Sequence, residues 1–139
     1  MKFSKTIEIS APPERVWAVM IDVERWPEWT PSVQSVEHLD RGPLAPGGRV
    51  RIRQPKLLPA VWKVTEFSGR SFTWRTGSLL VWVVGRHSVE PAGQGSRASL
   101  SLEFGGLFGW LVGRLFRDLN NRYLDMEATG LKRRSERSS

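Results

Sequence analysis

The sequence predicts an α+β fold in which a curved, seven-stranded antiparallel sheet wraps around one long C-terminal helix. Residues 33–104 alternate between apolar and polar side chains in short segments separated by turn residues, which is typical of consecutive antiparallel strands. After Gly106 the hydrophobic period changes from two to about 3.6 residues, which indicates a helix. Strands with one apolar face need a cover, and only this last segment is long enough to supply it.

The first thirty residues predict one strand followed by two short helices. Residues 3–9 alternate between apolar and polar side chains, as a strand with one solvent-facing side does. Pro13 and Glu14 suit the first turn of a helix, because proline lacks an N–H that this turn leaves unused and the carboxylate complements the helix dipole. Pro27 interrupts the next segment, so residues 23–29 are expected to form a second short helix or a turn.

Clusters of glycine, proline and serine divide the middle of the chain into six strands. The alternation also assigns their faces: Val50 and Ile52 belong to the inner side, opposite Arg49 and Arg51. For the strand that is apolar on both sides at its start, we assign the inner set as Val81, Val83, His87 and Val89. The six strands are expected near residues 33–40, 48–54, 60–67, 71–76, 79–90 and 96–104.

The C-terminal segment predicts a single helix of about 25 residues, or about 37 Å. Gly109 and Gly113 would let its first turns approach the sheet closely, and Gly130 is expected to fray its end. Its apolar stripe consists of Leu107, Leu111, Leu115, Leu119, Tyr123 and Met126, widened by Phe108, Val112 and Phe116.

Length and composition predict one domain without covalent cross-links. The chain has 139 residues, no cysteine and a net charge of +7. We place the domain at residues 1–134 and expect residues 135–139 to form a disordered basic tail. No signal-peptide core follows the first charged residues, and the apolar run 107–112 is far shorter than a bilayer span of about 20 residues. We therefore expect a soluble, cytoplasmic protein.

The space between a strongly bent sheet and the helix that it grips need not be filled, so this architecture predicts an internal cavity. We expect Trp26 and Trp29 at its mouth. Alternatively, the aromatic residues only fill the core, and Trp26 and Trp29 only pack the short helix onto the sheet. The residues expected to line the cavity are Trp62, Val64, Phe72, Trp74, Val83, His87, Leu100, Leu102, Phe116, Leu119, Asn120 and Tyr123.

Polar side chains on the inner faces are candidates for ligand contacts. His87 is expected to hydrogen-bond a ligand or to act as acid or base; alternatively, it is a satisfied core residue. Asn120 and Tyr123 lie on or beside the helical stripe and would anchor a polar head group. Alternatively, Asn120 faces solvent, as we expect of Arg122. Two distant histidines, no cysteine and no grouped carboxylates predict no metal site, and no motif indicates a cofactor.

Five stretches of the sequence resemble a known family. They are Ile7-Glu-Ile-Ser-Ala-Pro-Pro-Glu-Arg-Val-Trp17, Trp26-Pro-Glu-Trp29, Gly48-Arg-Val-Arg-Ile-Arg53, Phe72-Thr-Trp74 and Glu127-Ala-Thr-Gly-Leu-Lys132. Over nearly its whole length the chain resembles the START-like (SRPBCC) superfamily with the helix-grip fold, and within it the bacterial polyketide cyclase/dehydrase and lipid-transport group. The resemblance implies an internal cavity for a lipid, polyketide, sterol or aromatic compound, with catalysis in a minority of members. It carries over no catalytic residue.

Three functions remain open on the sequence. The leading hypothesis is a domain that binds or carries a hydrophobic small molecule in its cavity. The second is an enzyme of the cyclase or dehydratase kind, with His87 or Tyr123 as acid or base. The third is contact through the surface, either of residues 107–116 with an anionic membrane or of the outer sheet face with RNA. The outer-face residues are Arg49, Arg51, Arg53, Lys63, Arg75, Trp82, Arg86 and Arg97. The oligomeric state is left open.

Overall fold

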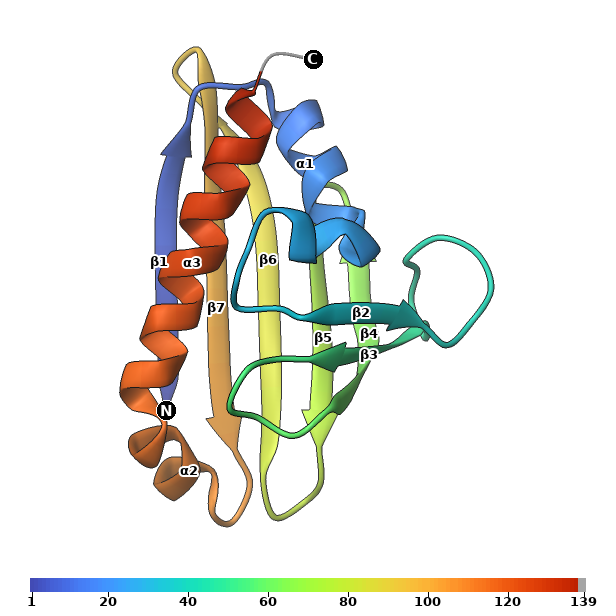
Figure 1. Ribbon diagram of the computed structural model, residues 1–139, viewed down its shortest axis with the longest axis vertical. Helices are drawn as coiled ribbons and strands as arrows, with labels where there is room; N and C mark the ends of the chain where they lie inside the picture. The colour runs from blue at the N-terminus through green and yellow to red at the C-terminus, as the bar shows by residue number, and fades with distance from the viewer. Residues whose placement is uncertain (138–139) are drawn as a thin grey trace.

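The computed structural model describes residues 1–137 and shows one seven-stranded antiparallel sheet in the order β1-β7-β6-β5-β4-β3-β2 (Figure 1). The six later strands therefore form a meander in chain order, and β7 then pairs with β1 at the far edge. This confirms the predicted fold class. The strands are β1 (Lys2–Ile9), β2 (Ser35–His38), β3 (Arg49–Arg53), β4 (Ala60–Ser68), β5 (Ser71–Gly77), β6 (Trp82–Ala92) and β7 (Gly95–Gly105).

Helical segments follow the first and the last strand. The helix α1 (Pro13–Ile21) and the 3-10 helix η1 (Val23–Glu28) lie between β1 and β2, where two short helices are expected. The helices α2 (Gly109–Leu115) and α3 (Arg117–Glu136) follow β7. None of the helices described within residues 1–137 is long and apolar enough to cross a membrane.

The predicted strand faces are confirmed on the strands that enclose the interior. On β3, Val50 and Ile52 are buried while the flanking arginines are exposed. On β6, His87 and Val89 are buried, and Val83 faces the interior as assigned. β6 begins at Trp82 and not near residue 79, because the amide of Ser78 donates to the carbonyl of Val81 and closes a turn at 2.7 Å.

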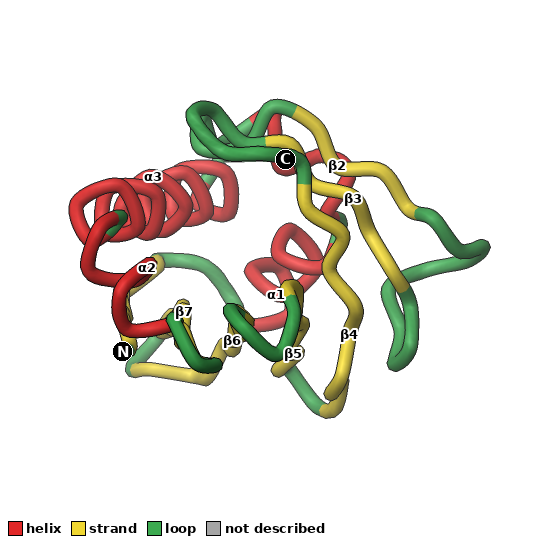
Figure 2. The backbone as a smooth tube through the Cα atoms, turned by 90° about the horizontal axis from the view of Figure 1, so that it is seen from below, coloured by secondary structure: helices red, strands yellow, loops and turns green. Residues whose placement is uncertain are grey.

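The sheet curls around an interior that α3 closes. Seen from below, it bends from β7 through β4 to β2, and α3 lies on the side that the sheet leaves open (Figure 2). α3 contacts β1, β7 and α1, and η1 lies against β2 (Figure 1). At about 1.5 Å per residue, the 20 residues of α3 span about 30 Å. This leaves the interior bounded by strands on one side and by α3 on the other.

The prediction of one continuous C-terminal helix is wrong, because the helix breaks at Phe116. Before the break, α2 packs on β7 through its two glycines. A Cβ on Gly113 would lie only 3.4 Å from the Cβ of Phe104, and one on Gly109 would lie 3.1 Å from the Phe104 carbonyl carbon. The predicted close approach of these glycines is confirmed.

The predicted apolar stripe is correspondingly wrong over its first half. Since the glycine face of α2 packs on the sheet, Leu107, Leu111 and Leu115 point away from it and are exposed. On α3 the buried face is also rotated from the leucine stripe, so that Leu119 and Met126 are only partly buried. The buried residues of α3 are Asn120, Tyr123, Leu124, Ala128, Gly130, Leu131 and Ser135.

The C-terminal end of α3 is more ordered than the sequence predicts. Ser135 is buried inside the helix, and the Glu136 carboxylate accepts from the amide of Ser10 at 2.7 Å and pairs with Lys132 at 2.6 Å. The expected disorder of residues 135–139 is therefore wrong at Ser135 and Glu136, and residues 138–139 lie outside the described part. Gly130 does not fray the helix but lies buried within it against Trp29.

Candidate ligand-binding cavity

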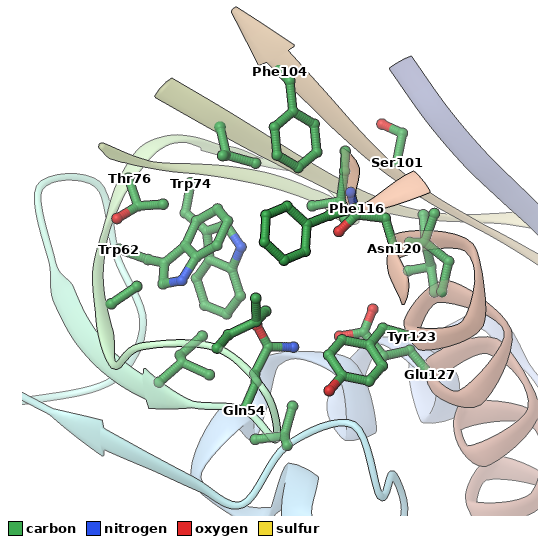
Figure 3. Close-up of a pocket in the computed structure, with 18 of the residues that line it drawn as sticks. Gln54, Trp62, Trp74, Thr76, Ser101, Phe104, Phe116, Asn120, Tyr123 and Glu127 are labelled. Atoms are coloured by element: carbon green, nitrogen blue, oxygen red, sulfur yellow. The ribbon is translucent and has the colours of Figure 1, made fainter. Parts of the chain in front are cut away.

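An internal cavity of about 390 Å³ lies between the sheet and α3 (Figure 3). Its walls come from η1, the inner faces of the strands, the loop 54–59 that joins β3 to β4, and one side of α2 and α3. The side chains labelled in Figure 3 converge on a common open space from the strands and from α3. The lining residues are Trp26, Val33, Ile52, Gln54, Lys56, Leu57, Leu58, Ala60, Trp62, Trp74, Thr76, Val83, His87, Leu100, Ser101, Leu102, Phe104, Val112, Phe116, Asn120, Tyr123, Leu124 and Glu127.

An aromatic cluster forms one end of the cavity. The ring centroids of Trp62 and Trp74 are 5.8 Å apart, and those of Trp26 and Trp74 are 5.4 Å apart. Trp26 also donates its indole N–H to the carbonyl of Met20 at 3.0 Å, which holds η1 against α1. These tilted ring pairs are stable arrangements for aromatic quadrupoles and make a rigid apolar wall.

His87 is part of this aromatic cluster. Its ring stacks on Phe72 at a centroid distance of 4.3 Å and meets Trp74 edge to face at 5.2 Å. Burial lowers the pKa of His87 to about 3, against a smaller opposing effect of a backbone hydrogen bond at Phe72. The imidazole is therefore neutral at physiological pH, and it can hydrogen-bond a ligand without carrying charge.

Three buried nitrogen atoms on the cavity wall find no hydrogen-bond partner among residues 1–137. They are the indole Nε1 of Trp62, the Nδ1 of His87 and the amide Nδ2 of Asn120. Buried polar atoms are nearly always satisfied, because each unpaired group costs about 1–3 kcal/mol. Three such atoms on one cavity wall are therefore available to hydrogen-bond a molecule that enters the cavity.

Tyr123 and Gln54 are already engaged and close the cavity on one side. The Tyr123 hydroxyl donates to the carbonyl of Pro55, which ties α3 to the loop 54–59. Burial raises the pKa of Tyr123, so the phenol stays protonated and keeps this bond. Gln54 donates its amide to the carbonyl of Ser32 at 3.2 Å. These bonds fix the loop that carries Leu57 and Leu58 to the cavity.

Glu127 is the functional candidate that sequence reasoning missed. It lies one turn beyond Tyr123 on α3, and its carboxyl group faces the cavity (Figure 3). Burial raises the pKa of Glu127 to about 8, so the group is mainly a neutral carboxylic acid at pH 7. The i, i+4 spacing from the predicted inner residue Tyr123 was the available signal, because residues four apart share a helix face.

Most of the predicted lining residues meet at the cavity, but Val64, Phe72 and Leu119 do not line it. Val64 and Phe72 are fully buried in the core, where Phe72 packs against Trp17 of α1 at a centroid distance of 6.1 Å. Leu119 lies off the inner face of α3 because of the rotation described above. The predicted residues that do line the cavity are Trp62, Trp74, Val83, His87, Leu100, Leu102, Phe116, Asn120 and Tyr123.

Trp26 of η1 and Trp29, which follows η1, do not lie at the mouth of the cavity as expected. Trp26 lines the cavity but is buried in its wall, and the Trp29 side chain packs against α3 at Gly130. The exposed lining residues instead mark an opening between the loop 54–59 and the break after α2. Leu58 and Phe116 are the large apolar side chains at this opening. Proline-rich loops show no periodicity, so the sequence pattern did not place residues 54–59.

The basic outer face of the sheet is largely neutralised by carboxylates on neighbouring strands. Arg51 pairs with Glu37 at 2.9 Å, Arg86 with Glu103 at 2.7 Å, and Arg97 with Glu8 at 2.6 Å. Arg49 likewise forms two contacts with Asp40. Arg75 stacks over the ring of Trp82 at 5.0 Å. Contact with RNA through this face stays a prediction, now with fewer free cations to support it.

The fold and the cavity together define a class of protein. A curved antiparallel sheet that grips a C-terminal helix around an internal cavity is the START-like, helix-grip arrangement. The family model for polyketide cyclase / dehydrase and lipid transport matches residues 1–136, and the chain belongs to that family. No curated protein sequence matches the chain.

Solved structures share the fold at low sequence identity. A protein from Thermus thermophilus is 22% identical, with a TM-score of 0.77 and coverage of 97% of each chain. A START superfamily protein from Mycobacterium smegmatis is 20% identical, with a TM-score of 0.76 and the same coverage. The Zhui aromatase/cyclase from Streptomyces sp. R1128 is 16% identical, with a TM-score of 0.73 and coverage of 96% of this chain and 94% of that one. Similarities at these identities show the fold alone.

Proposed function

We propose that this protein binds an uncharged, hydrophobic small molecule bearing oxygen acceptors in the cavity between the sheet and α3. The observation that carries the proposal is the set of unpaired buried nitrogens on an otherwise apolar wall, at Trp62, His87 and Asn120. The indole and amide groups are N–H donors, so the complementary ligand atoms are carbonyl, ether or hydroxyl oxygens. The family name, which joins polyketide chemistry and lipid transport, supports a ligand of this kind.

The size and charge of the cavity further restrict which ligands fit it. A volume of about 390 Å³ is at the lower end of the range for small-molecule sites, which is about 300–1,000 Å³. His87 is neutral, and Glu127 is mainly protonated at pH 7. Lys56, which is exposed, is the cation among the lining residues, and the groups on the inner wall are neutral. A charged group that reached the inner wall would therefore have to leave water without a counter-ion there. A neutral molecule of a few fused rings, or a short acyl chain, is therefore favoured.

The proposal is tested by filling the cavity. Ala60 lines the cavity on β4, and its neighbour Val61 is exposed on the opposite face of the strand. We expect Ala60→Phe to abolish the fluorescence enhancement of Nile red that the wild type produces, and the matched variant Val61→Phe to retain it. Equal enhancement by the two variants would show that the dye binds elsewhere on the surface and would remove the support for a ligand cavity.

A second candidate function uses the same cavity for dehydration, and Glu127 is the observation that favours it. A neutral carboxylic acid in an apolar cavity can give its proton to the hydroxyl group of a β-hydroxyketone, which leaves as water. The resulting carboxylate then takes the proton from the α-carbon, and the C–H electron pair forms the new double bond. Glu127 returns to its acid form, so the step needs no other reactant.

The dehydration candidate differs from simple binding in its pH profile. We expect turnover of a cyclic β-hydroxyketone to fall as pH rises through about 8, where Glu127 loses its proton, and to vanish in Glu127→Gln. His87→Phe would weaken substrate binding without moving that pH limit, because His87 does not titrate in this range. Turnover that survives Glu127→Gln would eliminate this role and leave the binding function intact.

A further inference from the structure

One end of the molecule exposes an unusual number of large apolar side chains. They lie on the β5–β6 connection, on the β7–α2 connection and on the outer side of α2, which meet at the bottom of Figure 1. Leu79 is 87% exposed, Leu107 68% and Leu115 71%. We call this surface the apolar end; it comprises Leu79, Leu80, Leu107, Phe108, Trp110, Leu111, Leu115 and Phe116.

The apolar end is one continuous surface and not a set of scattered residues. The amide of Phe108 donates to the carbonyl of Leu80 at 2.8 Å, and the amide of Leu107 to that of Leu79 at 3.4 Å, so the two connections lie side by side. The packing of α2 then fixes the outward direction of Trp110 and Leu111, because its glycine face is held against Phe104. Contiguous exposed apolar surface of this kind marks an interaction site in most proteins.

The apolar end also borders the opening of the cavity. Phe116, at the break between α2 and α3, is part of both surfaces: it lines the cavity and is 40% exposed. Figure 3 shows its ring projecting into the space between α3 and the tryptophans of the sheet. Val112 of α2 lines the same space. A molecule that crosses the apolar end at Phe116 therefore passes directly into the cavity.

Unpaired positive charges lie on α2 and α3, next to this surface. Arg114, Arg117 and Arg122 are exposed, and none of them forms an ion pair with another described residue. Asp118 is the one acidic residue between positions 105 and 124. The arginines of the outer sheet face differ, because nearby carboxylates neutralise four of them. Free cations are thus retained where the apolar residues are exposed.

We propose that the apolar end is a docking surface for an anionic lipid bilayer. The leucines and Phe108 would enter the acyl boundary, Trp110 would lie at the interface, and Arg114 and Arg117 would contact the lipid phosphates or carboxylates. Phe116 then forms the passage between bilayer and cavity; this second part rests on the proposed ligand-binding function, whereas docking itself does not. A second copy of the chain carries the same net charge of +7 and would leave these unpaired arginines without a complement.

Vesicle flotation of the full chain tests the docking surface. Phosphatidylcholine vesicles that contain phosphatidylserine should bind the wild type, and binding should decrease with added salt. The double variant Trp110→Ser, Leu115→Ser should lose about tenfold or more of the partitioning, because two large apolar side chains no longer enter the bilayer. Val61→Ser removes an exposed apolar residue from the outer face of β4, away from the apolar end, and this variant should bind like the wild type.

A second set of variants tests how much the arginines contribute to vesicle binding. Arg114→Ser, Arg117→Ser should reduce binding to the phosphatidylserine vesicles and leave the weaker binding to pure phosphatidylcholine unchanged. The control Arg15→Ser removes an exposed arginine of α1, away from the apolar end, and should change neither.

Several outcomes would overturn the proposal. They are absence of vesicle binding by the wild type, equal binding of wild type and the Trp110→Ser, Leu115→Ser variant, or a dimer that sedimentation detects and this variant abolishes. Nile red uptake without vesicles separates this result from the proposed function. A variant that fails to float but still takes up the dye shows that docking is lost while the cavity is intact. A wild type that floats but takes up no dye refutes the ligand cavity and not the docking surface.

Discussion

Asn120 is the single residue that bears most directly on the proposed ligand. Its side chain is buried on α3, faces the cavity and leaves its amide Nδ2 without a hydrogen bond in the described structure. A leucine at this position has nearly the same shape and needs no partner. The unliganded protein would therefore be expected to prefer leucine, and the presence of asparagine is explained if a ligand oxygen accepts its N–H.

We predict opposite effects of Asn120→Leu on stability and on binding. The free energy of unfolding of the unliganded protein should rise by about 1 kcal/mol, because an unpaired buried donor is removed. Affinity for 9-fluorenone, a ketone, should fall by about tenfold, while affinity for fluorene, which has a CH₂ group in place of the carbonyl, should not fall. Urea denaturation and quenching of tryptophan fluorescence measure the two effects.

The neighbouring residue supplies the control for this prediction. Asn121 is exposed on the same helix, so Asn121→Leu changes the same chemical group without touching the cavity. A loss of ketone binding in Asn121→Leu, or an unchanged preference for fluorenone over fluorene in Asn120→Leu, would contradict the assigned role.

Glu127 should make the stability of the protein depend on pH. Its pKa is raised from 4.5 to about 8 in the folded chain, so the unfolded chain loses its proton first and stability falls as pH rises between these values. His87 acts in the opposite direction between about 3 and 6.5, because its folded pKa is lowered and the unfolded chain takes up the proton. The two effects offset each other between about pH 4.5 and 6.5, and above pH 6.5 only that of Glu127 remains.

We therefore predict that stability falls between pH 6.5 and 8 at up to about 1.4 kcal/mol per pH unit. Glu127→Gln should flatten the curve in this range and leave the acid side below pH 4 unchanged, where other carboxylates with lowered pKa, such as Asp40 and Glu103, are titrated. Guanidinium denaturation at a series of pH values measures the slope. An identical slope in the variant would show that Glu127 is ionised in the folded protein.

Among the structural elements, the strands could be predicted from the sequence and the terminal helix only in part. Alternation assigned inner and outer faces correctly on β3 and β6, because one buried face imposes a strict period of two. The predicted apolar stripe is wrong at α2, because hydrophobicity alone assigns the leucines to the buried face. The packing there depends on how close two backbones approach, and the small residues Gly109 and Gly113 decide it.

The residues of the candidate site, too, could be predicted from the sequence only in part. The tryptophans and His87 follow from strand alternation, whereas Gln54 and Leu58 lie on a loop whose path only the folded chain defines. Glu127 could not be recognised from its type, because a glutamate on a helix is usually on a solvated face. Its i, i+4 spacing from Tyr123 places it near the inner face of α3 but does not by itself separate a lining residue from a solvated one.

Gly130 provides a prediction at the level of helix packing. Helix propensity alone would make Gly130→Ala more stable by up to about 1 kcal/mol. However, a Cβ at this position would lie 2.9 Å from Cε3 of Trp29 and would also contact the Trp29 carbonyl oxygen. We predict a net loss of about 1–3 kcal/mol, because the backbone of α3 must move away from Trp29.

Thr129→Ala is the matched control on the same turn of α3. Thr129 is exposed, so this change should leave the thermal unfolding midpoint unchanged or slightly raised. A midpoint for Gly130→Ala at or above that of the wild type would show that α3 and Trp29 are not in close contact.

Three features follow one another from the interior of the molecule to its surface. Its curved sheet and α3 enclose a cavity, the cavity opens at the break before α3, and that break lies within the exposed apolar end. The same glycine-mediated packing of α2 explains both the exposed leucines and the position of Phe116. On the proposed function, a ligand enters through this opening and the polar atoms on the cavity wall select it.

The central claim is that the cavity is completed by a ligand oxygen. The most direct test follows the indole N–H signals of uniformly ¹⁵N-labelled protein during titration with 9-fluorenone and with fluorene, using Trp62→Phe to assign the Trp62 signal. Fluorenone should move the Trp62 signal downfield, fluorene should perturb it much less, and the signal of the exposed Trp110 should respond to neither. Binding of fluorenone that leaves the Trp62 signal in place, or moves that of Trp110 instead, would contradict the claim.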